Sequence, residues 1–270
     1  MQKEQRIHSC KRLQTVERKF AMENKLAQLE KNMLDMQRMD HVMLMGCIHV
    51  CRATGEKAWR DMALEQVRAG VPDGAADGMP LLFAMEEDPA EDRRATIEAF
   101  AARPLDGLSM VDAYCVLPFR MAYEFRLNRM AWVSRVAAAF RSLHELLYDE
   151  KEALHHASVG AEVSAEATGW FLMALVDGIE QCDQQLYEHW RTMVDIFRYV
   201  LRGILRVGKA EEIPGMAAYS ILKGIRLGII DPERYRPVGL KLAESLPQGT
   251  HPGIEAMVCA EILMMNDAGR

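Results

Sequence analysis

The stretch GLSMVDAYCVLPFRMAYEF, residues 107–125, is apolar almost all the way round, yet one carboxylate, Asp112, lies near its middle. A helix without a polar face is covered by other parts of the protein on every side. An ionised carboxylate is costly to bury without a partner. The stretch therefore predicts an interior helix, and it raises the question of why an acid is placed there.

Apolar segments of this kind alternate with amphipathic segments along the chain. The amphipathic segments share a turn, a charged first helical turn and an apolar stripe, and they cover 54–67, 88–100, 126–140, 182–197 and 231–246. More uniformly apolar segments precede most of them, at 41–53, 107–125, 168–180 and 215–228. Covered inner helices that alternate with outer helices are typical of stacked helical hairpins. Because strand signals are almost missing, we expect an all-α fold, either an open solenoid or a closed ring whose mouth suits a small ligand.

Composition narrows the range of partners. The net charge is −6 and no basic run interleaved with aromatic residues occurs, so nucleic acid is an unexpected partner. No apolar run reaches the roughly 18 residues of a membrane-spanning helix, and the charged start MQKEQRIHSCKR lacks the apolar core of a signal peptide. The cysteines are scattered without metal-site spacing, which favours reduced thiols in a cytoplasmic protein that needs no metal or cofactor.

The chain reads as a single domain because no linker rich in Pro, Gly or Ser divides it. Residues 1–38 are charged, Met-rich and helical in pattern, and we separate them as an N-terminal segment from a ring-forming domain at 39–270. Periodicity leaves open whether this segment is a ring helix or an interaction helix. The stretch AGVPDGAADGMP, residues 69–80, is expected to be a loop between hairpins.

Several stretches, in the right order, resemble the unsaturated glucuronyl and rhamnogalacturonyl hydrolases, which are glycoside hydrolase families 88 and 105. They are MDHVMLMGCIHVCRATGEKAW (39–59), SMVDAYCVLPFRMAYE (109–124), LLYDEKEALHHAS (146–158), ATGWFLMALVDGIE (167–180), PGMAAYSILKGIRLGIIDPERY (214–235) and PGIEAMVCAEILMM (252–265). The resemblance implies an (α/α)6 barrel, which agrees with the alternation of helices described above.

The resemblance also implies a reaction. Members of these families act on oligosaccharides that end in a 4,5-unsaturated uronic acid, the product of pectin lyases and related lyases. An Asp protonates C4 of the enol-ether double bond and assists attack of water at C5, and the resulting hemiketal collapses to release the sugar. Such an acid must hold a proton near neutral pH, and an apolar wall would supply this because burial raises the pKa of a carboxyl group.

By resemblance, Asp112 occupies the position of this catalytic acid. Further residues match family positions at the mouth and would position the substrate: Asp77, His156, Trp170 and His41. For each residue a plain structural role stays open: an Asp bonded to a helix end, a solvated or helix-terminal His, or a core Trp. Asp106 competes with Asp112, but PLDG is typical of a helix start, so we expect Asp106 to cap the helix.

The resemblance is incomplete in ways that affect function. The family's R-G-N-G-W run is replaced by Glu166 and the residues up to Trp170, and a Glu in place of an Arg would repel a uronate carboxylate. The chain is also shorter than family members and lacks an aromatic loop. Beside the hydrolase, a non-catalytic sugar-binding or scaffold protein therefore stays open, as do a homodimer and, last, a helical-repeat interaction module with an open groove.

Overall fold

The computed structural model describes residues 20–70 and 78–267, and helices dominate this part of the chain. The inner helices are α2 (His41–Thr54), α4 (Gly78–Glu87), α6 (Met110–Arg126), α8 (Ala165–Gln181), α10 (Pro214–Arg226) and α12 (Pro252–Asp267). The outer helices are a helix at residues 20–34, α3 (Lys57–Arg68), α5 (Arg94–Ala101), α7 (Val133–Leu147), α9 (Tyr187–Arg206) and α11 (Pro232–Glu244). A short 3₁₀ helix, η1 (Lys209–Glu212), links α9 to α10.

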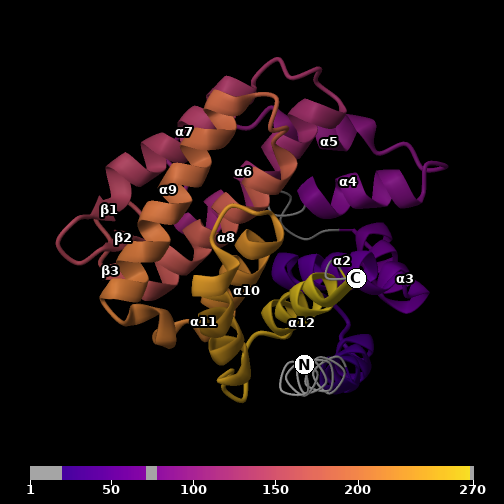
Figure 1. Ribbon diagram of the computed structural model, residues 1–270. Coiled ribbons are helices and arrows are strands. Elements are labelled where there is room, and N and C mark those ends of the chain that lie inside the picture. The colour runs from indigo at the N-terminus through magenta and orange to yellow at the C-terminus, as the bar shows by residue number, and fades with distance from the viewer. Residues whose placement is uncertain (1–19, 71–77, 268–270) are drawn as a thin grey trace, which may run out of the picture.

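The inner helices form a closed ring. Each packs against the next in chain order, and α12 packs against α2, so that the last inner helix lies beside the first (Figure 1). The predicted all-α fold, an (α/α)6 barrel, is therefore confirmed. The open superhelix expected of a helical-repeat interaction module is wrong, because its ends would not meet.

The residue pattern explains which helices are inner and which are outer. Helix α8 is buried around nearly its whole circumference, as its apolar sequence predicts. Helix α9 buries a single stripe, formed by Met193, Val194, Phe197, Val200, Leu201 and Ile204. Leu26, Leu29 and Met33 of the helix at residues 20–34 belong to the same hydrophobic core as the ring. The proposed domain division at residue 38 stays a prediction.

Two glycines allow the ring to close. A Cβ atom at Gly46 of α2 would lie 2.8 Å from the Cα of Gly253 in α12. A Cβ atom at Gly253 would overlap the backbone carbonyl of Val42. The two backbones therefore approach more closely than any side chain at these positions would permit.

One helix and one small sheet were not predicted from the sequence. Helix α4 is short and apolar, and a short apolar run does not distinguish helix from strand. The strands β1 (Tyr148–Asp149), β2 (Leu154–His156) and β3 (Val163–Ser164) form an antiparallel sheet in the order β1-β2-β3. Strands this short hold no alternating pattern from which they could be recognised.

Four of the five cysteines in the described residues are buried, and Cys51 is partly buried. None of those within the described residues forms a disulfide. Burial raises the pKa of the Cys47 thiol to about 12, so this sulfur is a core atom and not a nucleophile. Of the helices in the described ranges, none is both long and apolar enough to cross a membrane.

We expect Gly253→Ala to lower the free energy of unfolding by about 3 kcal/mol, because the added methyl group overlaps a backbone carbonyl that has no rotamer to move to. Urea unfolding followed by circular dichroism measures the change. As a control, Arg141→Ala on the exposed face of α7 should stay within about 0.5 kcal/mol of the wild type. Equal stability of Gly253→Ala and wild type would contradict the close approach of α2 and α12.

Candidate active site

Five of the inner helices, α2, α6, α8, α10 and α12, begin at the same end of the ring. We call this end the mouth, and it comprises residues 40–43, 109–112, 156–170, 212–216 and 250–254. Three of its helices are capped by side chains: Asp40, Ser109 and Ser164 accept hydrogen bonds from backbone N–H groups of the first turns of α2, α6 and α8. Five helix N-termini gathered in this way present partial positive charge to the mouth.

Asp112 lies in the first turn of α6, where it forms a capping box with Ser109. The Asp112 N–H donates to Ser109 Oγ at 3.1 Å, and the Ser109 N–H and Oγ–H donate to Asp112 Oδ2 at 3.1 and 2.6 Å. The expectation of an apolar wall around Asp112 is wrong, because the side chain is exposed. The expectation that Asp106 caps this helix is also wrong, since Ser109 is the N-cap. The acid is thus placed where a helix start needs an acceptor.

His156 lies at the mouth beside the start of α6. The Met110 N–H donates to the Ala157 carbonyl at 2.9 Å, which ties the end of β2 to the first turn of α6. The His156 Nδ1–H donates to the Ala161 carbonyl at 2.6 Å, so Nδ1 carries a proton and the ring is fixed by its own hairpin. The structure therefore brings the segments of His156 and Asp112 together.

Three rings form a row across the mouth. The His41 ring lies edge-on to Tyr114 with centroids 5.5 Å apart, and Tyr114 lies 5.3 Å from half-buried Trp170. Burial lowers the pKa of His41 to about 4 against the opposing charge of Asp40, so His41 is neutral at physiological pH. The Trp170 Nε1–H points to Glu166 Oε1 at 3.4 Å, so its indole edge is turned toward an acid. Tyr114 was not among the predicted site residues.

A cavity of about 410 Å³ opens beside this row, between the starts of α8, α10 and α12. Its wall includes Glu166, Glu212, Met216, Thr250 and Ile254. Asp112, His156, Trp170 and His41 do not line it, and Asp77 falls outside the described residues. The pocket was not foreseen because it forms where the starts of three helices meet, and these lie far apart in the sequence.

The charges at the mouth are mostly negative. Among the described residues, Glu212 forms an ion pair with Lys209. Neither Asp112 nor Glu166 forms an ion pair with a described residue. The Asp40 Oδ2 accepts from His251 Nε2–H at 2.8 Å, and this pair joins the start of α2 to the start of α12. No Lys or Arg occurs in the sequence segments that form the mouth. The positive ends of the helices are therefore the main attraction for an anion here.

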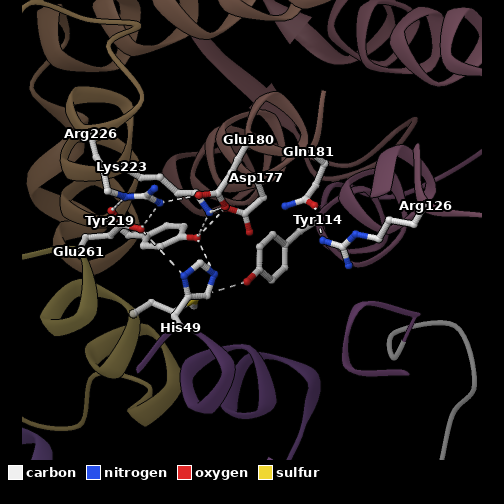
Figure 2. Close-up of polar contacts among 11 residues, drawn as sticks. His49, Tyr114, Arg126, Asp177, Glu180, Gln181, Tyr219, Lys223, Arg226 and Glu261 are labelled. Atoms are coloured by element: carbon white, nitrogen blue, oxygen red, sulfur yellow. Dashed lines mark hydrogen bonds and ion pairs between the residues drawn. The ribbon is translucent and has the colours of Figure 1, made fainter. Parts of the chain in front are cut away.

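A second polar group of side chains lies deeper in the ring, and sequence reasoning missed it. We call it the buried charge cluster: His49, Asp177, Glu180, Tyr219, Lys223, Arg226 and Glu261 (Figure 2). Lys223 Nζ lies 2.8 Å from Asp177 Oδ1 and 2.7 Å from Glu180 Oε2. Arg226 lies 2.7 Å from Glu261 and 2.6 Å from Glu180. These pairs connect α8, α10 and α12.

Tyr219 extends the buried charge cluster to α2. Its hydroxyl donates to Asp177 Oδ1 at 2.6 Å, accepts from Lys223 Nζ at 3.0 Å, and lies 3.1 Å from His49 Nε2. Burial opposes the charge on Lys223, but Asp177 and Glu180 together raise its pKa. The sequence did carry a signal, because a Lys and an Asp in the apolar runs SILKGI and ALVDGI are as unusual as Asp112 in its own run.

This ring of hairpins is the architecture of several carbohydrate-active proteins. A polysaccharide lyase structure has a TM-score of 0.72 at 13% identity, covering 94% of this chain and 99% of that chain. A family 105 glycoside hydrolase from C. acetobutylicum ATCC 824 has a TM-score of 0.71 at 14% identity, covering 92% and 99%. A glycosyl hydrolase family 88 protein from Bacteroides vulgatus has a TM-score of 0.70 at 13% identity, covering 93% and 98%.

These comparisons show that the chain shares its (α/α)6 barrel fold with these proteins. The resemblance to families 88 and 105 that was inferred from the sequence is confirmed at the level of the fold. No protein-family model and no curated protein sequence matches the chain. Sequence identities of 13–14% show that the fold is shared. The substrate and the mechanism have to be inferred from the side chains of this chain.

We expect Lys223→Met to lower the free energy of unfolding by about 3–5 kcal/mol, because it leaves buried Asp177 without a cation. The double variant Lys223→Met/Asp177→Leu removes both charges and should recover most of the loss. Urea unfolding of the wild type and both variants measures this. A double variant no more stable than Lys223→Met would show that packing, and not charge pairing, explains the effect.

His41 should make the protein sensitive to acid. Its pKa falls from 6.5 to about 4 on folding, so below pH 6.5 the unfolded chain binds a proton that the folded protein does not. Stability is thus undiminished above pH 6.5 and is lost as the pH falls toward 4, by about 2 kcal/mol between pH 6.5 and 5. His41→Phe should reduce that loss by this amount, as measured by urea unfolding at the two pH values. An unchanged loss would mean that His41 is protonated in the folded protein.

Proposed function

We propose that the protein hydrolyses oligosaccharides that end in an unsaturated uronic acid, with Asp112 as the acid and base. The observation that carries this proposal is the position of Asp112: an exposed carboxylate in the first turn of an inner helix, at the mouth of a barrel shared with glycoside hydrolases of families 88 and 105. The sequence around Asp112 resembles the corresponding helix of those families. A substrate at the mouth would meet this acid directly.

The proposed step adds water across the double bond. Both bonds from Ser109 end on Asp112 Oδ2, so Oδ1 is the oxygen that would transfer a proton to C4. Because Asp112 is exposed, the bound sugar itself would have to cover the carboxyl group in place of the apolar wall that was expected. The same carboxylate would then take a proton from the water that attacks C5, and the hemiketal would open to release the next sugar. Trp170 would offer a ring face to the sugar, and we propose that His156, His41 and Asp77 would orient it.

A second candidate is a sugar-binding protein without catalytic activity. Glu166 and Glu212 line the cavity at the mouth, and they would repel a uronate while accepting hydrogen bonds from neutral sugar hydroxyls. The capping box accounts for Asp112 without any reaction. This candidate predicts binding of a neutral oligosaccharide and no loss of an unsaturated bond.

The two candidates are separated by incubating the protein with an unsaturated galacturonyl-rhamnose disaccharide and following the ultraviolet absorbance of its double bond. Asp112→Asn should slow the loss of absorbance by about a hundredfold or more, because the proton donor is removed. Ser109→Ala is the matched control: it breaks the same cap, at a cost of about 1 kcal/mol, but keeps the carboxylate and most of the activity.

Each outcome has a defined meaning. Equal losses of activity in Asp112→Asn and Ser109→Ala would assign Asp112 to the helix cap alone. If the wild type at high concentration leaves the absorbance unchanged, the enzyme proposal is wrong. Calorimetric titration with a neutral oligosaccharide would then test the binding candidate.

A further inference from the structure

A groove of about 870 Å³ lies on the outer wall of the ring, and none of the residues that line it belongs to the mouth. Helix α5, the segment 102–107, the end of α6 and helix α7 enclose it. Three arginines line this groove: Arg103, Arg120 and Arg135. Its volume lies within the range of ordinary small-molecule sites.

Arg120 is unusual among the buried cations of the described residues. Arg93 lies beside Asp88 and Glu91, and Lys223 lies beside Asp177 and Glu180. Arg120 is only 9% exposed, yet no carboxylate of the described residues lies within ion-pair distance of it. A buried charge without a counter-ion is costly.

The bonds that Arg120 makes leave part of its guanidinium unused. Nη1–H donates to the Arg103 carbonyl at 3.2 Å, and Nε–H has no acceptor. The acid one turn further along α6, Glu124, is fully buried and already accepts from Asn128 Nδ2 and from the Trp132 N–H at 2.8 Å. Burial also lowers the pKa of Arg120, although Glu124 opposes this.

The guanidinium groups of the other two arginines lie over aromatic rings. The Arg135 guanidinium lies 4.2 Å from the centre of the Trp132 ring, and that of Arg103 lies 4.9 Å from Phe100. An arginine held in this way keeps its N–H edge available for an acceptor. Two acids also line the groove, of which Glu98 is bonded to Arg94 at 2.8 Å and Asp106 is exposed.

We propose that this groove binds a small organic molecule that carries a carboxylate or phosphate group next to an apolar part. The anionic group would bond to the N–H groups of Arg120 and Arg135, because the planar guanidinium matches both oxyanions with paired hydrogen bonds. The apolar part would contact Leu105, Leu143 and Leu146, which line the same groove. The site is separate from Asp112 and does not depend on the reaction proposed for it.

Phenyl phosphate and phenylacetate test the two anionic groups, and benzyl alcohol serves as the neutral control. We expect one or both anions to bind in a calorimetric titration and to raise the thermal unfolding midpoint, while benzyl alcohol does neither. Added salt should weaken the binding, since exposed Arg135 is screened. The anion that binds more tightly identifies the group as phosphate or carboxylate.

Arg135→Gln removes an exposed arginine from the groove, and Arg141→Gln makes the same change of charge on the same helix outside the groove. Arg135→Gln should weaken binding by about tenfold or more, whereas Arg141→Gln and Asp112→Asn should bind as the wild type does. Arg120→Met should keep the fold, as judged by circular dichroism, and lose binding. Absence of binding by both anions, or equal weakening in the two Gln variants, would overturn the proposal.

Discussion

The alignment of helices in the barrel depends on one physical constraint: a charged side chain buried inside a protein needs a partner of opposite charge. Lys223 is buried in the ring, and the fold holds Asp177 and Glu180 against it. Because these groups belong to different inner helices, a sideways or axial displacement of one helix would separate a cation from an anion in a poorly solvated interior. Apolar packing alone tolerates such slippage much better. The buried charge cluster therefore specifies how α2, α8, α10 and α12 are aligned.

The mouth follows from that alignment. With the inner helices in register, their first turns lie at one level, and each start needs acceptors for its free N–H groups. Asp40, Ser109 and Ser164 supply them. The Gly46–Gly253 contact then brings α12 against α2, so that Asp40 reaches His251. Local helix chemistry, and not a binding motif, thus places most of the polar atoms at the mouth.

The sequence predicted the fold better than the site. Inner helices such as α8 were recognisable because they lack a polar face over their whole length, and such a pattern survives any change of surface residues. Asp112 was correctly placed on an inner helix but wrongly assigned a buried setting, because helix periodicity does not show how far the first turn projects from the ring. The partners of Lys223 were hidden for another reason: Asp177 and Glu180 lie on the preceding inner helix, α8, and only the packing of α8 against α10 brings them to Lys223.

The capping box has a consequence for how function is gained and lost in this barrel. An acid that stabilises the start of α6 contributes to folding whether or not any substrate is turned over. The presence of Asp112 is therefore explained by the helix start alone and is by itself no sign of catalytic activity in this barrel. Because Asp112 stabilises the start of α6, its carboxyl group stays at the mouth whether or not it takes part in a reaction. A barrel that has become a binding protein would retain a usable acid, and new catalysis could evolve around it by changes in its neighbours alone.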